Sequence, residues 1–252
     1  MITGKDILIL STQDWDALPT RKHHWARKLA SRGNRVIYVE QQMHLLGWLA
    51  DIGNQYKRIW SWIYGPRTVS ENLWIYTLPI VLPFFQVFRF VNSLNNSVLV
   101  PIIRWALRRI GLNINILWVY TPHAVGLIGR FGEEFVVYEC VDDFTATRGL
   151  VRSSTIGALE QDLLSMVDQD LLSMVDQVIV THPGLQEAKS GISRRLALIP
   201  NGADLRHFAL AGHQDTIPPK EVSDLPKPVI GFHGWIQYWI DFDLIAYAAH
   251  KR

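Results

Sequence analysis

The segment at residues 178–208, VIVTHPGLQEAKSGISRRLALIPNGADLRHF, constrains the fold of this chain more than any other part of the sequence. Residues 177–181 are largely apolar and β-branched without alternation, which is typical of a parallel strand buried on both faces. Pro183 follows, where the first turn of a helix accepts a missing N–H. Residues 196–200 repeat the strand pattern, and Asn201-Gly202 suits a sharp turn. Strand, helix, strand and turn together predict a βαβ unit.

The N-terminal part of the chain predicts more of the same sheet. Residues 6–11 (DILILS) and 35–40 (RVIYVE) are expected to be buried parallel strands, joined by a polar loop and a helix at 20–32 that closes at Gly33. Further strands are expected at 73–78, 114–120 and 135–139, and a helix at 101–110. The predicted fold class is α/β, a doubly wound parallel sheet of six or seven strands, in which ligands collect outside the carboxyl ends of the strands.

The C-terminal part predicts a second, Rossmann-like unit. We expect residues 1–208 to form the first domain and residues 209–227, which are polar and rich in proline, to form an extended linker. Residues 229–234 (VIGFHG) are typical of a first strand with a glycine-bounded loop, and residues 240–250 of a first helix. One strand and one helix cannot close a sheet. We therefore expect residues 228–252 to be the start of a truncated domain or to dock onto the first one.

An eight-residue repeat interrupts this pattern, because DLLSMVDQ occurs at residues 162–169 and again at 170–177. The apolar positions of the two copies stay near one stripe of a helix, so a helix can absorb the duplication and lengthen by about 12 Å. Two copies of eight residues are far shorter than the repeats of a solenoid, which indicates a local duplication.

Composition excludes several classes of protein. The 252 residues are 48% apolar, which is ample for a packed core, and the net charge of +2 is too small to argue for binding of nucleic acid. A single cysteine, Cys140, excludes an internal disulfide and any zinc site built from cysteines. The N-terminus runs directly into a strand without the pattern of a signal peptide, so we expect the protein in the cytoplasm.

Ten tryptophans give the chain a possible link to membranes. The longest apolar stretch, residues 73–88, is interrupted by polar and proline residues and is too short to span a bilayer. Tryptophans at 43–67 and 83–109 nevertheless lie close to arginine and lysine, as at a peripheral contact with an anionic membrane. The alternative is that these rings pack beneath long loops. Both interpretations stay open.

Three further segments carry a resemblance to a known family: residues 11–40, 136–144 (VVYECVDDF) and 228–244 (PVIGFHGWIQYWIDFDL). Together with residues 178–208 they resemble GT-B glycosyltransferases, most of all bacterial enzymes of envelope-polysaccharide synthesis such as those of teichuronic acid. The resemblance implies that the first domain binds an acceptor and that a second domain binds a nucleotide-sugar. Transfer would occur between them, with no metal and no cofactor besides the nucleotide-sugar substrate.

Candidate catalytic residues follow two of the expected strands. Asp142 and Asp143 come directly after a buried strand, where two adjacent carboxylates in a partly dry cleft could accept a proton from an acceptor hydroxyl. The same residues are also good turn formers. His123 follows another strand and is a second candidate, although a lone histidine at a strand end is more often structural.

Candidate binding residues lie after the first strand and at the start of the second domain. The resemblance places donor phosphate and acceptor near the first loop, where Gln13, Asp14, Trp15 and Asp16 would face the cleft and Arg21 and Lys22 would add positive charge at a helix N-terminus. The alternative there is a helix cap with a solvated basic face. Gly231 and Gly234 resemble a loop that approaches donor phosphates through its backbone N–H groups.

The sequence therefore favours a glycosyltransferase, or its acceptor-binding half, that moves a sugar from a nucleotide-sugar to an envelope polysaccharide or a lipid-linked acceptor. A non-catalytic, membrane-associated α/β binding module, or an inactive fragment, is the alternative. A nicotinamide oxidoreductase is disfavoured, because no glycine-rich dinucleotide fingerprint follows the first strand.

Overall fold

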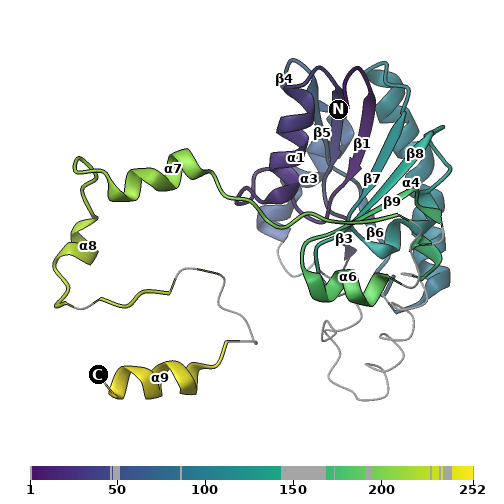
Figure 1. Cartoon of the computed structure of the whole chain (residues 1–252). Coiled ribbons are helices and arrows are strands. Elements are labelled where there is room, and N and C mark those ends of the chain that lie inside the picture. Colours follow the sequence, from purple (N-terminus) through teal and green to yellow (C-terminus); the bar gives the residue numbers. More distant parts are fainter. Residues whose placement is uncertain are drawn as a thin grey trace. The chain divides into compact units, whose positions relative to one another are not determined.

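The computed structural model describes residues 2–45, 47, 52–85, 87–142, 169–172, 174–190, 195–227, 229–232, 234 and 240–251 (Figure 1). The chain divides into two compact units, Met1–Gly202 and Ala203–Arg252. Each unit is described by itself.

The first unit is built on an eight-stranded sheet in the order β10-β9-β8-β7-β1-β2-β5-β4. All neighbouring strands are parallel except β4 and β5, which form an antiparallel pair. The strands are β1 (Asp6–Leu10), β2 (Arg35–Val39), β4 (Arg67–Ser70), β5 (Leu73–Tyr76), β7 (Ile116–Val119), β8 (Phe135–Cys140), β9 (Gln177–Val180) and β10 (Leu196–Leu198). The predicted Rossmann-like parallel sheet is thus confirmed.

Strand order changes direction at β1. From β1 the chain proceeds outward through β2 to β5, and then returns to place β7 on the other side of β1. Such a reversal leaves a crevice at the carboxyl ends of the two diverging strands, because their connections run to opposite faces of the sheet. The carboxyl ends of β1 and β7 therefore mark the position where a ligand is expected.

Helices cover both faces of this sheet (Figure 1). They are α1 (Arg21–Ala30), α3 (Ile52–Tyr64), α4 (Arg89–Arg109) and α6 (Pro183–Lys189), with a 3₁₀ helix, η1 (Pro122–Leu127). A small parallel pair, β3 (Met43–His44) with β6 (Ile80–Val81), stands apart from the main sheet. None of the described helices combines the length and the apolar composition needed to cross a bilayer.

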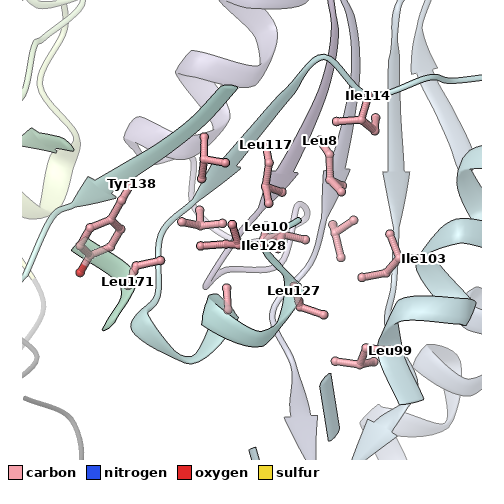
Figure 2. Close-up of a cluster of buried hydrophobic side chains, with 14 of the residues drawn as sticks. Leu8, Leu10, Leu99, Ile103, Ile114, Leu117, Leu127, Ile128, Tyr138 and Leu171 are labelled. Carbon is pink, nitrogen blue, oxygen red and sulfur yellow. The ribbon is translucent and has the colours of Figure 1, made fainter. Parts of the chain in front are cut away.

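Alternate residues of the central strands pack into two separate cores. Ile7 and Ile9 of β1 pack with α1, whereas Leu8 and Leu10 lie in the opposite core, which Leu99, Ile103 and Leu127 complete (Figure 2). Every residue of β1 is buried, which explains why its sequence is apolar without alternation after Asp6. The two cores hold α1 and α4 against opposite faces of the sheet.

The ends of α1 follow from local chemistry. The backbone N–H of Thr20 donates to Nδ1 of His23 at 3.0 Å, which satisfies a group at the helix start. At the other end Gly33 has φ of +79°, a conformation that glycine adopts without strain, and its N–H donates to the carbonyl of Ala30 at 3.0 Å. The prediction of a helix at residues 20–32 that ends at Gly33 is confirmed.

In the first unit, the start of one helix and one strand of the main sheet differ from the sequence prediction. Helix α4 begins at Arg89, not at residue 101, because Pro101 lies inside it and does not begin it. Burial of Leu99 and Ile103 on either side of the proline holds the helix together. Strand β4 was not predicted, because each residue of its sequence RTVS is exposed and the sequence lacks an apolar pattern.

The repeat falls mostly outside the described residues. Residues 143–168 contain most of its first copy and are not described. In the second copy Leu171 and Leu172 are helical and fully or almost fully buried in the core. The prediction that one helix absorbs both copies stays a prediction.

The second unit contains helices α7 (Leu205–Ala209), η2 (Leu210–Gly212), α8 (Lys220–Ser223) and α9 (Phe242–His250). The expected C-terminal helix is confirmed as α9, where Asp241 accepts the N–H of Leu244 at 2.9 Å. The strand expected at 229–234 is not formed at 229–232 or 234, the part of it that the structure describes. A lone strand without a neighbour has no partner for its backbone groups, which accounts for this difference.

Candidate functional site

Three loops of the first unit leave the sheet at its carboxyl edge near the switch point, the place between β1 and β7 where the strand order reverses. They follow β1, β7 and β8, which are consecutive parallel neighbours in the order β8-β7-β1. The loop after β1 leads into α1, so the N-terminus of α1 lies at the same edge. Most of the first-unit residues singled out in the sequence lie here.

Glu139, near the end of β8, is the centre of this edge. Its side chain is completely buried and forms an ion pair with Nε of Arg21. The indole N–H groups of Trp25 and Trp118 donate to it at 3.1 and 2.8 Å. A buried carboxylate is costly unless donors surround it, and here one cation and two N–H groups do so.

Arg21 connects α1 with β8 and with the segment after β10. Besides its ion pair with Glu139, its Nη1 donates to the carbonyl of Pro200, just after β10, at 2.8 Å. The side chain is only 13% exposed. Nη2 of Arg21 is buried and finds no acceptor among the described residues. Arg21 therefore lies at the predicted edge, with part of its guanidinium committed to structure.

Lys22 lies beside two carboxylates. Burial lowers the pKa of the Lys22 ammonium, and the charges of Asp142 and Glu139 oppose this shift. The ammonium also lies 5.4 Å from the centre of the Tyr120 ring, a cation–π contact. Burial and then the charge of Glu139 raise the pKa of Tyr120. The structure thus brings Lys22 and Asp142, two of the predicted residues, together.

Asp142 is exposed and lies at the carboxyl edge directly beyond β8. The thiol of Cys140 donates to its backbone carbonyl at 3.3 Å, which leaves the carboxylate out of that contact. Asp143 lies outside the described residues. Asp142 is thus exposed and does not lie in the partly dry surroundings that the sequence suggested, and its role as a base stays a prediction.

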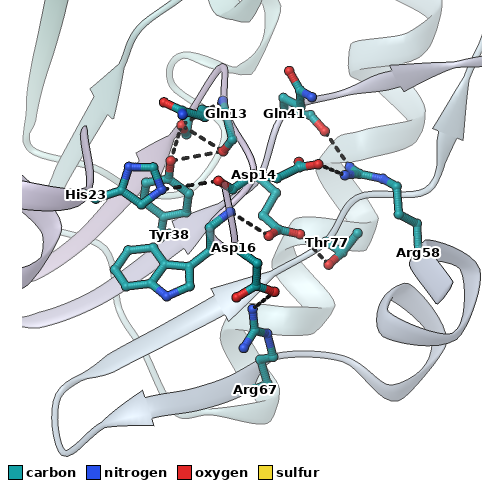
Figure 3. Close-up of polar contacts among 12 residues, drawn as sticks. Gln13, Asp14, Asp16, His23, Tyr38, Gln41, Arg58, Arg67 and Thr77 are labelled. Carbon is teal, nitrogen blue, oxygen red and sulfur yellow. Dashed lines mark hydrogen bonds and ion pairs between the residues drawn. The ribbon is translucent and has the colours of Figure 1, made fainter. Parts of the chain in front are cut away.

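The loop after β1 is held by partners within the protein (Figure 3). Asp14 pairs with Arg58 at 2.6 Å, and Asp16 with Arg67 at 2.7 Å. Oε1 of Gln13 accepts the hydroxyl of Thr20 at 2.6 Å. These partners come from α3, β4 and the residue before α1, so distant segments position this loop.

Trp15 points into the protein. It is 6% exposed, and its ring lies 5.1 Å from His23 and 5.0 Å from Tyr38. The backbone N–H of Trp15 donates to Oε1 of Glu40 at 2.9 Å, and Oε2 of Glu40 accepts the hydroxyl of Thr77 at 2.6 Å. Trp15 is therefore a packing residue of the loop, and Glu40 is a carboxylate directly after β2 that holds the loop.

His123 lies in η1, just beyond β7. It is 6% exposed, and burial lowers its pKa to about 4, so the ring is neutral at pH 7. Phe85 packs edge-on against the ring, with the ring centres 5.4 Å apart. The backbone carbonyl of His123 accepts hydrogen bonds from the side-chain amides of Asn92 and Asn96 at 3.1 and 2.9 Å. Nδ1 of the ring has no partner among the described residues.

Gly231 and Gly234 belong to the second unit. Both are exposed, and a Cβ on Gly231 would meet nothing within 4 Å, so space alone does not require glycine there. Their role in binding donor phosphate stays a prediction.

Sequence reasoning missed Glu139, the residue that organises the edge. The signal was present, because a glutamate inside the apolar run VVYEC must find compensation when the strand is buried. Its partners, however, are up to 118 residues away in the chain. Arg58 and Arg67, which hold the first loop, carried no comparable signal.

Comparison with known proteins identifies the fold. No family model matches the chain, and no curated protein does. The chain is similar to sucrose-phosphate synthase from Thermosynechococcus elongatus with a TM-score of 0.55 at 14% identity, over 80% of this chain and 49% of that one. The first unit has the Rossmann-like fold found in GT-B glycosyltransferases.

Two further solved structures match the chain at lower TM-scores. The catalytic domain of starch synthase IV from Arabidopsis thaliana, bound to ADP and acarbose, matches with a TM-score of 0.45 at 12% identity, over 81% of this chain and 52% of that one. Apo UGT2 of Phytolacca americana gives 0.42 at 14%, over 81% and 54%. This chain spans about half the length of these proteins.

Proposed function

We propose that this chain is a glycosyltransferase, or the acceptor-binding half of one. It would transfer a sugar from a nucleotide-sugar to a cell-envelope polysaccharide or a lipid-linked acceptor. One observation carries the proposal: Arg21, Lys22 and Asp142 gather around Glu139 at the carboxyl edge of a Rossmann-like sheet, next to its switch point. Ligands of open α/β sheets bind at this position.

The chemistry of this edge suits sugar transfer. The acceptor hydroxyl attacks the anomeric carbon, the bond between that carbon and the phosphate oxygen breaks, and the nucleotide leaves as a diphosphate. The acceptor hydroxyl loses its proton to a base, the role we assign to Asp142 with Asp143. Lys22 and Arg21, at the N-terminus of α1, favour the negative charge that develops on the leaving group.

We assign residues 1–208 to the acceptor side, 209–227 to a linker and 228–252 to a donor-binding region that includes Gly231 and Gly234. We further infer that the protein works in the cytoplasm, at the inner face of the cell membrane. The acceptors named above carry or meet lipid at that surface.

The test is a transferase assay that follows nucleotide release from a panel of UDP-, GDP- and TDP-sugars in the presence of envelope lipid and polysaccharide extracts. The assay uses the chain itself and a form extended at its C-terminus by a Rossmann-like donor-binding domain. We expect acceptor-dependent release in the extended form. If no donor and acceptor pair gives release in either form, the proposal is wrong.

A second candidate function is an α/β binding module that lies on a membrane without catalysis. The observation that favours it is the row of exposed apolar side chains on α4, of which Phe90 is 71% exposed. If the protein binds membranes but releases no nucleotide in the transferase assay, the non-catalytic binding module is the correct function.

A further inference from the structure

Helix α4 has two apolar faces. One packs into the core and carries Leu99 and Ile103 (Figure 2). These two side chains and that of Ala106 are completely buried. The other, here called the α4 stripe, consists of Phe90, Leu94, Val98, Pro101 and Trp105. These positions recur at intervals of four, four, three and four residues, which places them on one side of a helix.

The α4 stripe is exposed along its length. Phe90 is 71% exposed, Leu94 50%, Val98 52% and Trp105 43%, and Pro101 is also exposed. A helix that packs on a sheet normally has a polar outer face. A second apolar face, about 22 Å long at 1.5 Å per residue from Phe90 to Trp105, is therefore a surface for something to cover.

Aromatic side chains of α3 lie near one end of this stripe. Gly65, the first residue after α3, packs so closely against Trp105 that a Cβ there would lie 3.0 Å from the ring. In the last turns of α3, Trp60 and Tyr64 stack at 6.0 Å and are 54% and 70% exposed. Phe90 at one end and aromatic rings at the other give the arrangement preferred at a membrane interface.

Charge decides which partner suits the α4 stripe. Residues 52–109 contain seven lysines and arginines and one acidic residue. Three of the arginines, Arg58, Arg67 and Arg89, pair with aspartates outside this range. Three others, Arg104, Arg108 and Arg109, lie in the last turns of α4 at the Trp105 end of the stripe. Helix α4 itself has no acidic residue, and Arg108 continues the line of the stripe three residues beyond Trp105. An anionic lipid surface would attract these arginines.

We propose that the α4 stripe, with Arg108, is a docking surface for anionic lipid, on which α4 lies in the plane of the interface. The Phe90 end of the stripe lies close to the carboxyl edge, since Asn92 and Asn96 of α4 bind the carbonyl of His123. Docking would therefore hold the candidate site beside the lipid headgroups. Given the proposed function, the acceptor sugar is then lipid-linked.

The experiment measures sedimentation of the 252-residue protein with vesicles of phosphatidylcholine alone or with phosphatidylglycerol, at salt giving Debye lengths of about 30 Å and about 3 Å. We expect binding to the anionic vesicles that weakens as salt rises. Leu94→Ser with Val98→Ser should lower binding at least about ten-fold at both salt concentrations. Arg108→Gln should lower it about five-fold at low salt and leave binding to neutral vesicles unchanged.

Matched controls are Leu18→Ser, an exposed leucine in the loop before α1, and Arg32→Gln, an exposed arginine just after α1. Both should bind vesicles like the unchanged protein, and circular dichroism should show all variants folded. Absence of binding at low salt, or equal losses in the controls, would overturn the proposal. So would a dimer in light scattering that the Leu94 and Val98 substitutions abolish. The vesicles contain no sugar acceptor, so the result is independent of the transferase assay.

Discussion

At the scale of single residues, the Arg21–Glu139 pair makes the strongest prediction about stability. Arg21→Met leaves a fully buried carboxylate without its cation and should lower the free energy of unfolding by about 3 kcal/mol. Urea unfolding of both forms measures this loss. In a Glu139→Gln background the same substitution should cost much less, since no buried charge remains. Equal costs in both backgrounds would show that the pair is not coupled.

His123 makes stability depend on pH. The folded protein keeps its ring neutral down to a pKa of about 4, whereas the unfolded chain protonates near its ordinary value of 6.5. Between these values only the unfolded state binds the proton, so stability falls as the pH is lowered through this window, by up to about 3 kcal/mol. Carboxylates titrate in the same range. The difference between the unchanged protein and His123→Gln in urea unfolding from pH 7 to 4 therefore isolates His123, and parallel curves would contradict the prediction.

Asp142 and Asp143 are tested by turnover. In the extended, active form, Asp142→Asn or Asp143→Asn should lower the rate of sugar transfer about 100-fold if one of them is the base. Asp204→Asn is a control, because Asp204 caps α7 through the N–H groups of Arg206 and His207. Unchanged turnover in both variants would show that neither carboxylate is the base, and that the two residues serve only to form a turn.

The residues of the site were only partly predictable from sequence. Arg21, Lys22 and Asp142 could be placed at one edge because the carboxyl ends of parallel strands share an edge, a rule that needs no contact information. The direction of Trp15 into the core could not be predicted. It depends on Glu40 and Tyr38 of another strand and on His23 of the next helix.

At the scale of elements, strands buried on both faces were predictable because they read as unbroken apolar runs. Strand β4 could not be predicted, because an exposed edge strand needs no apolar residues. The start of α4 was predicted at the wrong residue, because a proline such as Pro101 is typical of the first turn of a helix. The proline is tolerated in the middle of α4 since tertiary packing of the buried face outweighs its local cost.

The cost of Pro101 to the stability of α4 can be measured. Pro101→Ala restores a backbone donor inside an intact helix and should raise the free energy of unfolding by about 1–3 kcal/mol, because a proline in a helix interior is unfavourable by about that much. Thermal and urea unfolding would show it. Ser93→Ala on the same helix, where the backbone N–H is already present, should change stability by less than about 0.5 kcal/mol. A loss of stability in Pro101→Ala would mean that the core requires the bend that the proline imposes.

At the scale of the whole molecule, the two units differ in how much they bury. The first has two cores, whereas all described residues at 203–251 are exposed except Ile240, which is half-buried. Exposed apolar side chains such as Phe208, Ile217 and Phe232 lie along this second unit. A pocket for a nucleotide-sugar needs converging, partly buried walls, which the described part of the second unit does not form.

The affinity of this 252-residue chain for nucleotide-sugars follows from that difference. Because the first unit is assigned to the acceptor and the second presents no walled pocket, we expect UDP-, GDP- and TDP-sugars to bind with a Kd weaker than about 1 mM in calorimetric titration. A cooperative thermal transition in the same sample would show that the first unit is folded and that weak binding is not a consequence of unfolding. Binding at micromolar strength would instead place the donor site in the first unit. In that case Lys22→Met, which removes a cation at the carboxyl edge, should weaken it, and the proposed division between acceptor and donor sides would be wrong.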